Sequence, residues 1–143
     1  MLSQTHGVKY IKEINVKLYD EILECLKTYK YKYEETTFEG HPMIKLLIND
    51  KDRITIELFA KGSRIKICFW HSLDEVDEET IYSKVNLVNL ANVEEGAVLY
   101  FKEKLIYRYY MDITEQTQAE DIISQIEFLS VVSAYLFMLV KTS

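Results

Sequence analysis

The sequence predicts a single α+β domain in which helices flank an antiparallel sheet, in the order α-β-β-β(-β)-α-β-β-α. Apolar residues recur with helical spacing near both ends of the chain, and between them lie short apolar runs separated by turn residues. With four Gly and one Pro in the sequence, no linker divides residues 1–143. The chain is long enough to bury a core without metal or disulfide support, and 48% of its residues are hydrophobic.

The first helix is predicted between Ile11 and Tyr29, where apolar residues recur at steps of three and four. Near its end, cations interleave with aromatic rings in the run Lys27, Tyr29, Lys30, Tyr31, Lys32 and Tyr33. Such a pattern can stack nucleic-acid bases. The net charge of −6 argues against a nucleic-acid partner, so we interpret the run as a helix end that leads into an edge strand.

A meander of four strands should follow. The predicted strands are 31–38, the weakest of them, 43–49, 53–60 and 64–71. Alternation in the third and fourth strands predicts one packed face, which carries residues such as Ile56 and Ile67. The opposite face includes Phe59, Cys68 and Trp70, which indicates that it is partly covered too.

The second helix should begin within residues 74–79, where five carboxylates would offset the helix dipole. Its apolar side carries Ile81, Val85 and Val88. Its three asparagines are poor helix formers, so packing or hydrogen bonds must hold them. They are Asn86, Asn89 and Asn92.

A hairpin is predicted from 97–101 and 105–113, joined through the polar tripeptide 102–104. On its second strand, Tyr107 and Tyr109 fall on the core face. Arg108 and Tyr110 fall on the other face. They either complete an ordinary sheet surface, which we favour, or form a docking site, because both residue types are enriched where proteins dock.

The final helix should begin at a capping box formed by Thr117 and Glu120. One stripe of it is predicted to pack on the core: Ile122, Ile126, Leu129, Ser133, Leu136 and Val140. Four more apolar residues point away from that stripe: Val131, Tyr135, Met138 and Leu139. Either a second layer of the same domain or a partner should cover them. A membrane span needs about 20 consecutive apolar residues, whereas the run FLSVVSAYLFMLV is shorter and contains two serines, so we expect no membrane insertion.

The sequence contains no recognisable catalytic or metal-binding pattern. His6, His41 and His71 lack zinc-site spacing. Cys68 and His71 differ by three positions on a strand, so their side chains should diverge rather than form a catalytic pair. We interpret the acidic run 74–79 as a helix start rather than a cation site. We therefore expect no enzyme activity, no metal and no cofactor.

The N-terminus, MLSQTHGVKY, lacks the pattern of a secretory signal. Cys25 and Cys68 both lie in apolar patterns, which favours reduced, buried thiols. These two observations predict a cytoplasmic protein.

The segment VNLVNLANVEEGAVLYFKEKLIYRYYMDI, followed by a long helix, resembles the YbjN-type domains of bacteria, which are similar in fold to type III secretion chaperones. By architecture the resemblance spans residues 10–141, and by motif 86–113. It implies an antiparallel sheet flanked by helices, no assigned catalytic residues, and self-association or partner binding.

Our leading hypothesis is a non-catalytic bacterial protein-binding module, chaperone-like or regulatory, that docks a protein partner or a second copy as a homodimer. The expected partner-binding residues are Trp70, Arg108, Tyr110, Val131, Tyr135, Met138 and Leu139. One alternative is a small-ligand-binding protein or enzyme with a pocket between sheet and helices. Another is an inhibitor or immunity protein whose acidic surface suits a basic target.

Overall fold

The computed structural model describes residues 4–58, 64–91 and 96–142, and only the backbone of residues 4–15. Three helices and six strands follow one another in the predicted order. They are α1 (Gln4–Thr28), β1 (Tyr33–Phe38), β2 (His41–Leu47), β3 (Asp52–Leu58), β4 (Arg64–Ser72), α2 (Glu78–Ala91), β5 (Ala97–Phe101), β6 (Lys104–Asp112) and α3 (Ala119–Lys141). The predicted fold class is therefore confirmed, and the strand predicted over Tyr31–Phe38 forms over Tyr33–Phe38.

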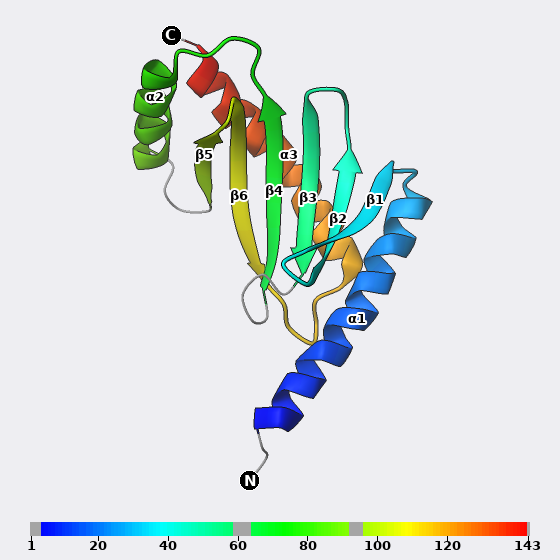
Figure 1. Cartoon of the computed structure of the whole chain (residues 1–143). Coiled ribbons are helices and arrows are strands. Elements are labelled where there is room, and N and C mark those ends of the chain that lie inside the picture. The colour runs from blue at the N-terminus through cyan, green and yellow to red at the C-terminus, as the bar shows by residue number, and fades with distance from the viewer. Residues whose placement is uncertain (1–3, 59–63, 92–95, 143) are drawn as a thin grey trace.

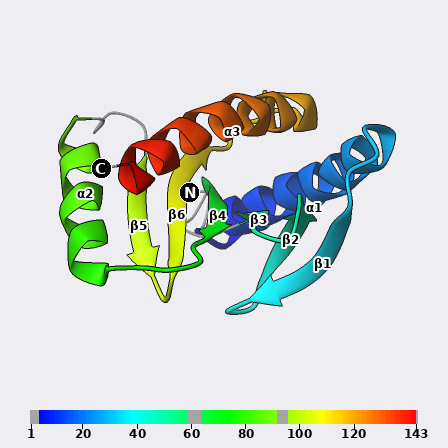
Figure 2. The same cartoon turned by 90° about the horizontal axis from the view of Figure 1, so that it is seen from above.

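The six strands make one antiparallel sheet in the order β1-β2-β3-β4-β6-β5. Helices α1 and α3 lie on one face of this sheet, and α2 stands beside its β5 edge (Figures 1 and 2). Within the described residues, no helix lies over the opposite face, which is turned toward the viewer in Figure 1. The described part of the chain thus forms two layers, and none of its elements covers the outer side of α3.

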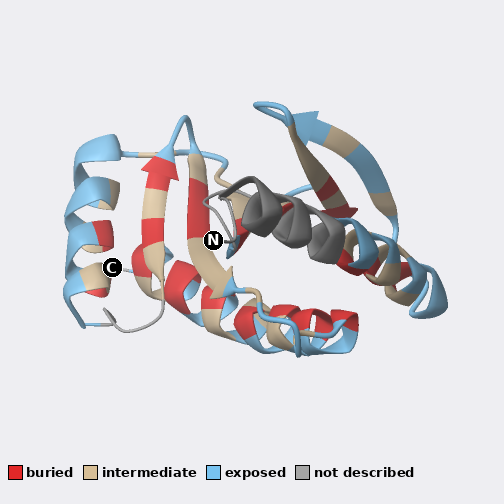
Figure 3. Ribbon diagram, turned by 90° about the horizontal axis from the view of Figure 1, so that it is seen from below, coloured by how far each residue is buried: buried red, intermediate tan, exposed pale blue. Residues whose placement is uncertain are grey.

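The core fills the space between the sheet and the helices α1 and α3. Its largest fully buried side chains are Ile22, Leu26, Ile44, Leu46, Ile56, Leu58, Ile65, Ile67, Leu105, Ile122, Ile126 and Leu129. Strands β2 to β6 contribute alternate residues to this core, as the pattern predicted, whereas β1 contributes only the partly buried Tyr33. All six residues of the stripe predicted for the final helix are buried, and red marks this inner side of α3 in Figure 3.

The start of α3 differs from the prediction by one residue. The cap is Gln118 rather than Thr117, and the backbone N–H of Gln118 donates to the Asp121 carboxylate at 3.1 Å. The Thr117 hydroxyl accepts instead from the backbone N–H of Thr114 at 2.9 Å. A local turn therefore takes the hydroxyl that the sequence pattern assigned to the helix cap.

A side chain of α2 forms hydrogen bonds with the backbone of the edge strand β5. The amide of Asn89 donates to the Val98 carbonyl and accepts from the Val98 N–H, both at 2.8 Å. It thereby satisfies backbone groups that an edge strand would otherwise expose. This contact confirms that a hydrogen bond holds an asparagine in the second helix. At the other edge, none of the described strands pairs with the outer side of β1.

Candidate interaction surfaces

The outer side of α3 carries a row of exposed apolar side chains, which we call the α3 stripe: Phe128, Val131, Tyr135 and Met138. Between 48% and 72% of each residue is exposed. The steps of three, four and three residues place them in one line along the helix, with the spacing of a coiled-coil seam. The sequence predicted three of the four members.

Leu139 does not belong to this row, although the sequence predicted that it points away from the core. It is half-buried and packs against the core cluster. Phe128 takes its place, 57% exposed. Phe128 lies three residues before Val131 and seven before Tyr135, and this helical spacing is the signal that could have identified it from the sequence.

Of the described helices, α3 also has the length and composition of a membrane span. Its mean hydropathy is 1.8 over the most apolar window, and 39% of that window is buried inside the domain. Packing on the sheet explains the apolar character of the inner side, whereas the α3 stripe makes no contribution to the domain's own core.

The uncovered face of the sheet, which we call the open sheet face, carries long cationic and aromatic side chains. They are Lys45, Arg53, Lys66, Trp70, Arg108 and Tyr110, which the strand register places on one side of β2, β3, β4 and β6. All six are half-buried. This face includes three predicted partner-binding residues, and it lies on the opposite side of the domain from the α3 stripe (Figure 2).

Two guanidinium groups on this face lie over aromatic rings. Arg53 is 5.1 Å from the centroid of the Trp70 ring, and Arg108 is 5.6 Å from that of Tyr110. The Trp70 indole N–H donates to the Thr55 hydroxyl at 2.9 Å, which fixes the ring against the sheet. These contacts preorganise both guanidinium groups at a fixed place on the sheet.

Cys68 lies within the open sheet face and is 4% exposed. Burial raises the pKa of its thiol, and the nearby cations of Lys66 and Arg108 offset part of that rise. A thiol with a raised pKa is a poor nucleophile. His71 lies on the core face of β4, so the predicted divergence of these two side chains is confirmed.

A polar cluster ties the end of α3 to the sheet. The Nδ1 atom of His71 lies 2.6 Å from the Asp52 carboxylate, and its Nε2 atom lies 3.0 Å from the Lys141 amine. The ring also stacks on Phe137, with 5.8 Å between centroids. An ammonium group can only donate, so Nδ1–H donates to Asp52 and Nε2 accepts from Lys141.

The Asp52 carboxylate should stabilise the fold near neutral pH and lose that effect in acid. Its burial would raise the pKa of the carboxyl, but hydrogen bonds with His71 and Asn49 outweigh burial and leave the pKa below its usual value. A lowered pKa gives stability that is present above the unfolded-state pKa of about 3.9 and is lost as pH falls through the folded-state pKa. We expect Asp52→Asn to cost about 1 kcal/mol at pH 7, since over a third of the side chain is exposed.

Urea unfolding at pH 7 and at pH 3 would measure this change. The difference between Asp52→Asn and the wild type should shrink at pH 3, while Asp50→Asn, in an exposed turn, should have little effect at either pH. An equal loss at both pH values would contradict the assignment.

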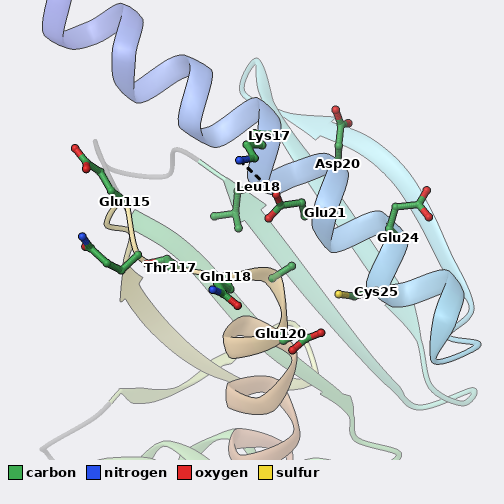
Figure 4. Close-up of a pocket in the computed structure, with 12 residues that line it drawn as sticks. Lys17, Leu18, Asp20, Glu21, Glu24, Cys25, Glu115, Thr117, Gln118 and Glu120 are labelled. Carbon is green, nitrogen blue, oxygen red and sulfur yellow. Dashed lines mark ion pairs between the residues drawn. The ribbon is translucent and has the colours of Figure 1, made fainter.

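An acidic groove of about 710 Å³ lies between α1 and the segment that leads into α3 (Figure 4). Its lining includes five carboxylates: Asp20, Glu21, Glu24, Glu115 and Glu120. Lys17 lines it too and pairs with Glu21 at 4.0 Å. Burial and the neighbouring carboxylates of Glu120, Glu21 and Glu24 raise the pKa of the Cys25 thiol, which disfavours the thiolate.

This groove differs from the pocket expected for a small-ligand-binding protein or enzyme. It is formed by α1, the loop before α3 and the first residues of α3 rather than by the sheet, and its lining residues include no tyrosine or arginine. Within the described residues, no group of three or more His, Cys, Asp or Glu side chains is arranged to hold a metal ion.

No family model matches the chain, and no curated protein matches its sequence. Among solved structures, the chain is similar to YbjN from E. coli, described as a candidate transcription regulator, with 12% identity and a TM-score of 0.56. The match covers 85% of this chain and 87% of that one. The chain therefore has a YbjN-like fold, which the resemblance in its sequence predicted.

Proposed function

We propose that the chain is a non-catalytic protein-binding module that self-associates through the α3 stripe. The observation that carries this proposal is the line of four large apolar side chains exposed on a helix whose inner side already completes the core. Contiguous apolar patches of this kind mark interaction sites. The coiled-coil spacing of the stripe favours another helix with the same spacing as its occupant.

Charge supports an antiparallel pair of α3 helices. The first turn of α3 contains Glu120 and Asp121, and its last turn contains Lys141. In an antiparallel pair, Lys141 of each helix lies about one helical turn from Asp121 of the other, and the two helix dipoles oppose each other. Phe128 would then face Met138 of the second copy, and Val131 would face Tyr135.

The dimer should be weak. Burying the exposed parts of four side chains on each copy gains several kcal/mol, but the cost of association is of similar size. A single helix pair also buries less area than a standard protein interface. We therefore expect dissociation on dilution rather than a permanent dimer.

Sedimentation velocity over a wide range of protein concentrations tests the proposal. The wild type should pass from monomer to dimer as concentration rises, and Val131→Asp should remain monomeric, because Val131 is 72% exposed and its loss spares the core. Leu90→Asp is the matched control, since Leu90 is 76% exposed on α2, away from the stripe. A wild type that is monomeric throughout, or an equal loss in the control, would overturn the proposal.

A further inference from the structure

We infer that the open sheet face binds an acidic, partly apolar polypeptide segment of a partner protein. This surface is distinct from the α3 stripe, and its binding does not require self-association. Its residues lie on the helix-free side of the sheet, where β2, β3, β4 and β6 present their outward side chains. Four points support an acidic occupant.

First, the face is locally cationic on an acidic protein. The chain carries a net charge of −6, yet Lys45, Arg53 and Arg108 have no ion pair within the described ranges. Lys66 lies 3.8 Å from Glu57, and Lys45 is the cross-strand partner of Glu34 on β1, so each of these two lysines has a carboxylate as a neighbour on this face. Arg53 and Arg108 therefore remain as uncompensated cations at the middle of the sheet, and they complement an anionic ligand.

Second, the two arginines are positioned to bind carboxylates. Each guanidinium group is held over an aromatic ring, Arg53 on Trp70 and Arg108 on Tyr110. A guanidinium group placed in this way keeps N–H donors in its plane, and these can bind a carboxylate with two parallel hydrogen bonds. Little side-chain freedom remains to be lost on binding.

Third, apolar side chains lie in the same cross-strand row as Arg53. Leu99 and Ile106 continue the row of Arg53 and Trp70 across β5 and β6, while Leu47 ends the row on β2 and is 41% exposed. A segment with alternating acidic and apolar residues would satisfy both kinds of group.

Fourth, the same contacts favour a polypeptide over a single-stranded nucleic acid. Base stacking needs bare ring faces, and here guanidinium groups already lie over the rings. The acidic remainder of the protein would also repel a polyanion that extends beyond this face.

A labelled peptide of alternating Glu and Leu is a suitable probe. From β2 to β6 are three strand spacings, roughly 14 Å, which an extended peptide of about nine residues more than spans. Fluorescence anisotropy should be measured with the chain carrying Val131→Asp, so that the result is independent of self-association through α3. We expect binding that weakens as salt is added.

The double variant Arg53→Gln, Arg108→Gln should weaken binding about tenfold or more. Lys17→Gln, Lys27→Gln is its matched control, because it removes the same charge from exposed positions on α1 and should have little effect. Far-UV circular dichroism and urea unfolding would show that both double variants are folded. A peptide with Gln in place of Glu should bind poorly.

Three results would overturn the inference. The first is no binding of the acidic peptide by the folded chain. The second is an equal loss in the α1 control, which would mean that the open sheet face is not the site. The third is tighter binding of a single-stranded oligonucleotide, which would assign the face to nucleic acid instead. None of these results depends on whether the α3 stripe forms dimers.

Discussion

Gly96→Ala is expected to destabilise the domain by about 2–4 kcal/mol. Gly96 precedes β5 with φ of +148°, a conformation that side chains disfavour. A Cβ atom there would lie 2.7 Å from the Arg108 carbonyl oxygen and 2.8 Å from the Tyr107 hydroxyl. The carbonyl belongs to the backbone of β6, so it cannot move away without disturbing the pairing of β5 with β6.

Gly40→Ala is the matched control for this substitution. Gly40 lies in the β1–β2 turn with φ of +80°, and nothing lies within 4 Å of the site of a Cβ atom. Conformational strain alone should cost about 1–2 kcal/mol. Urea unfolding of both variants would separate the two contributions. If Gly40→Ala proved as costly as Gly96→Ala, the clash would not be the cause.

Leu129→Ala is expected to cost about 2–5 kcal/mol, whereas Val131→Ala should change the stability of the monomer by less than about 0.5 kcal/mol. The two residues are neighbours on α3, but Leu129 is fully buried and Val131 is 72% exposed. Removing side-chain atoms from Leu129 leaves a cavity beneath the helix, and removing them from Val131 leaves none.

Unfolding at a protein concentration low enough to exclude dimers is the appropriate measurement. Similar losses in both variants would mean that the outer side of α3 is also packed within the domain, and the proposed role of the α3 stripe would fail with it. The pair of variants therefore tests which side of α3 faces the core, and the proposed function depends on that orientation.

Local periodicity was sufficient to predict most of the fold. The stripe on the final helix was predicted residue by residue because burial of one helix side imposes a 3.6-residue repeat on the sequence. The strand faces followed from alternation in the same way. The contact between Arg53 and Trp70 could also have been predicted, because these residues become cross-strand partners when β3 and β4 are paired about the segment that connects them.

Features that depend on contacts between distant segments could not be predicted. The contact between His71 and Lys141 joins β4 to the end of α3, and no local pattern links these two residues. The acidic groove likewise combines carboxylates of α1 with those near the start of α3. The sequence also could not show whether a further layer of the domain covers the outer side of α3, because the residue type alone does not tell whether an apolar side chain is exposed or covered.

The pairing of Asn89 with Val98 limits how copies of this protein can join through their sheets. A fibre can grow by strand addition only if every molecule has two strand edges free to pair. Each added molecule then leaves one free edge for the next. Here α2 covers the edge strand β5, so β1 is the one edge strand of the described sheet that is free to pair. Two molecules that paired through their β1 strands would leave no free edge strand on either copy, so this kind of assembly would stop at a dimer.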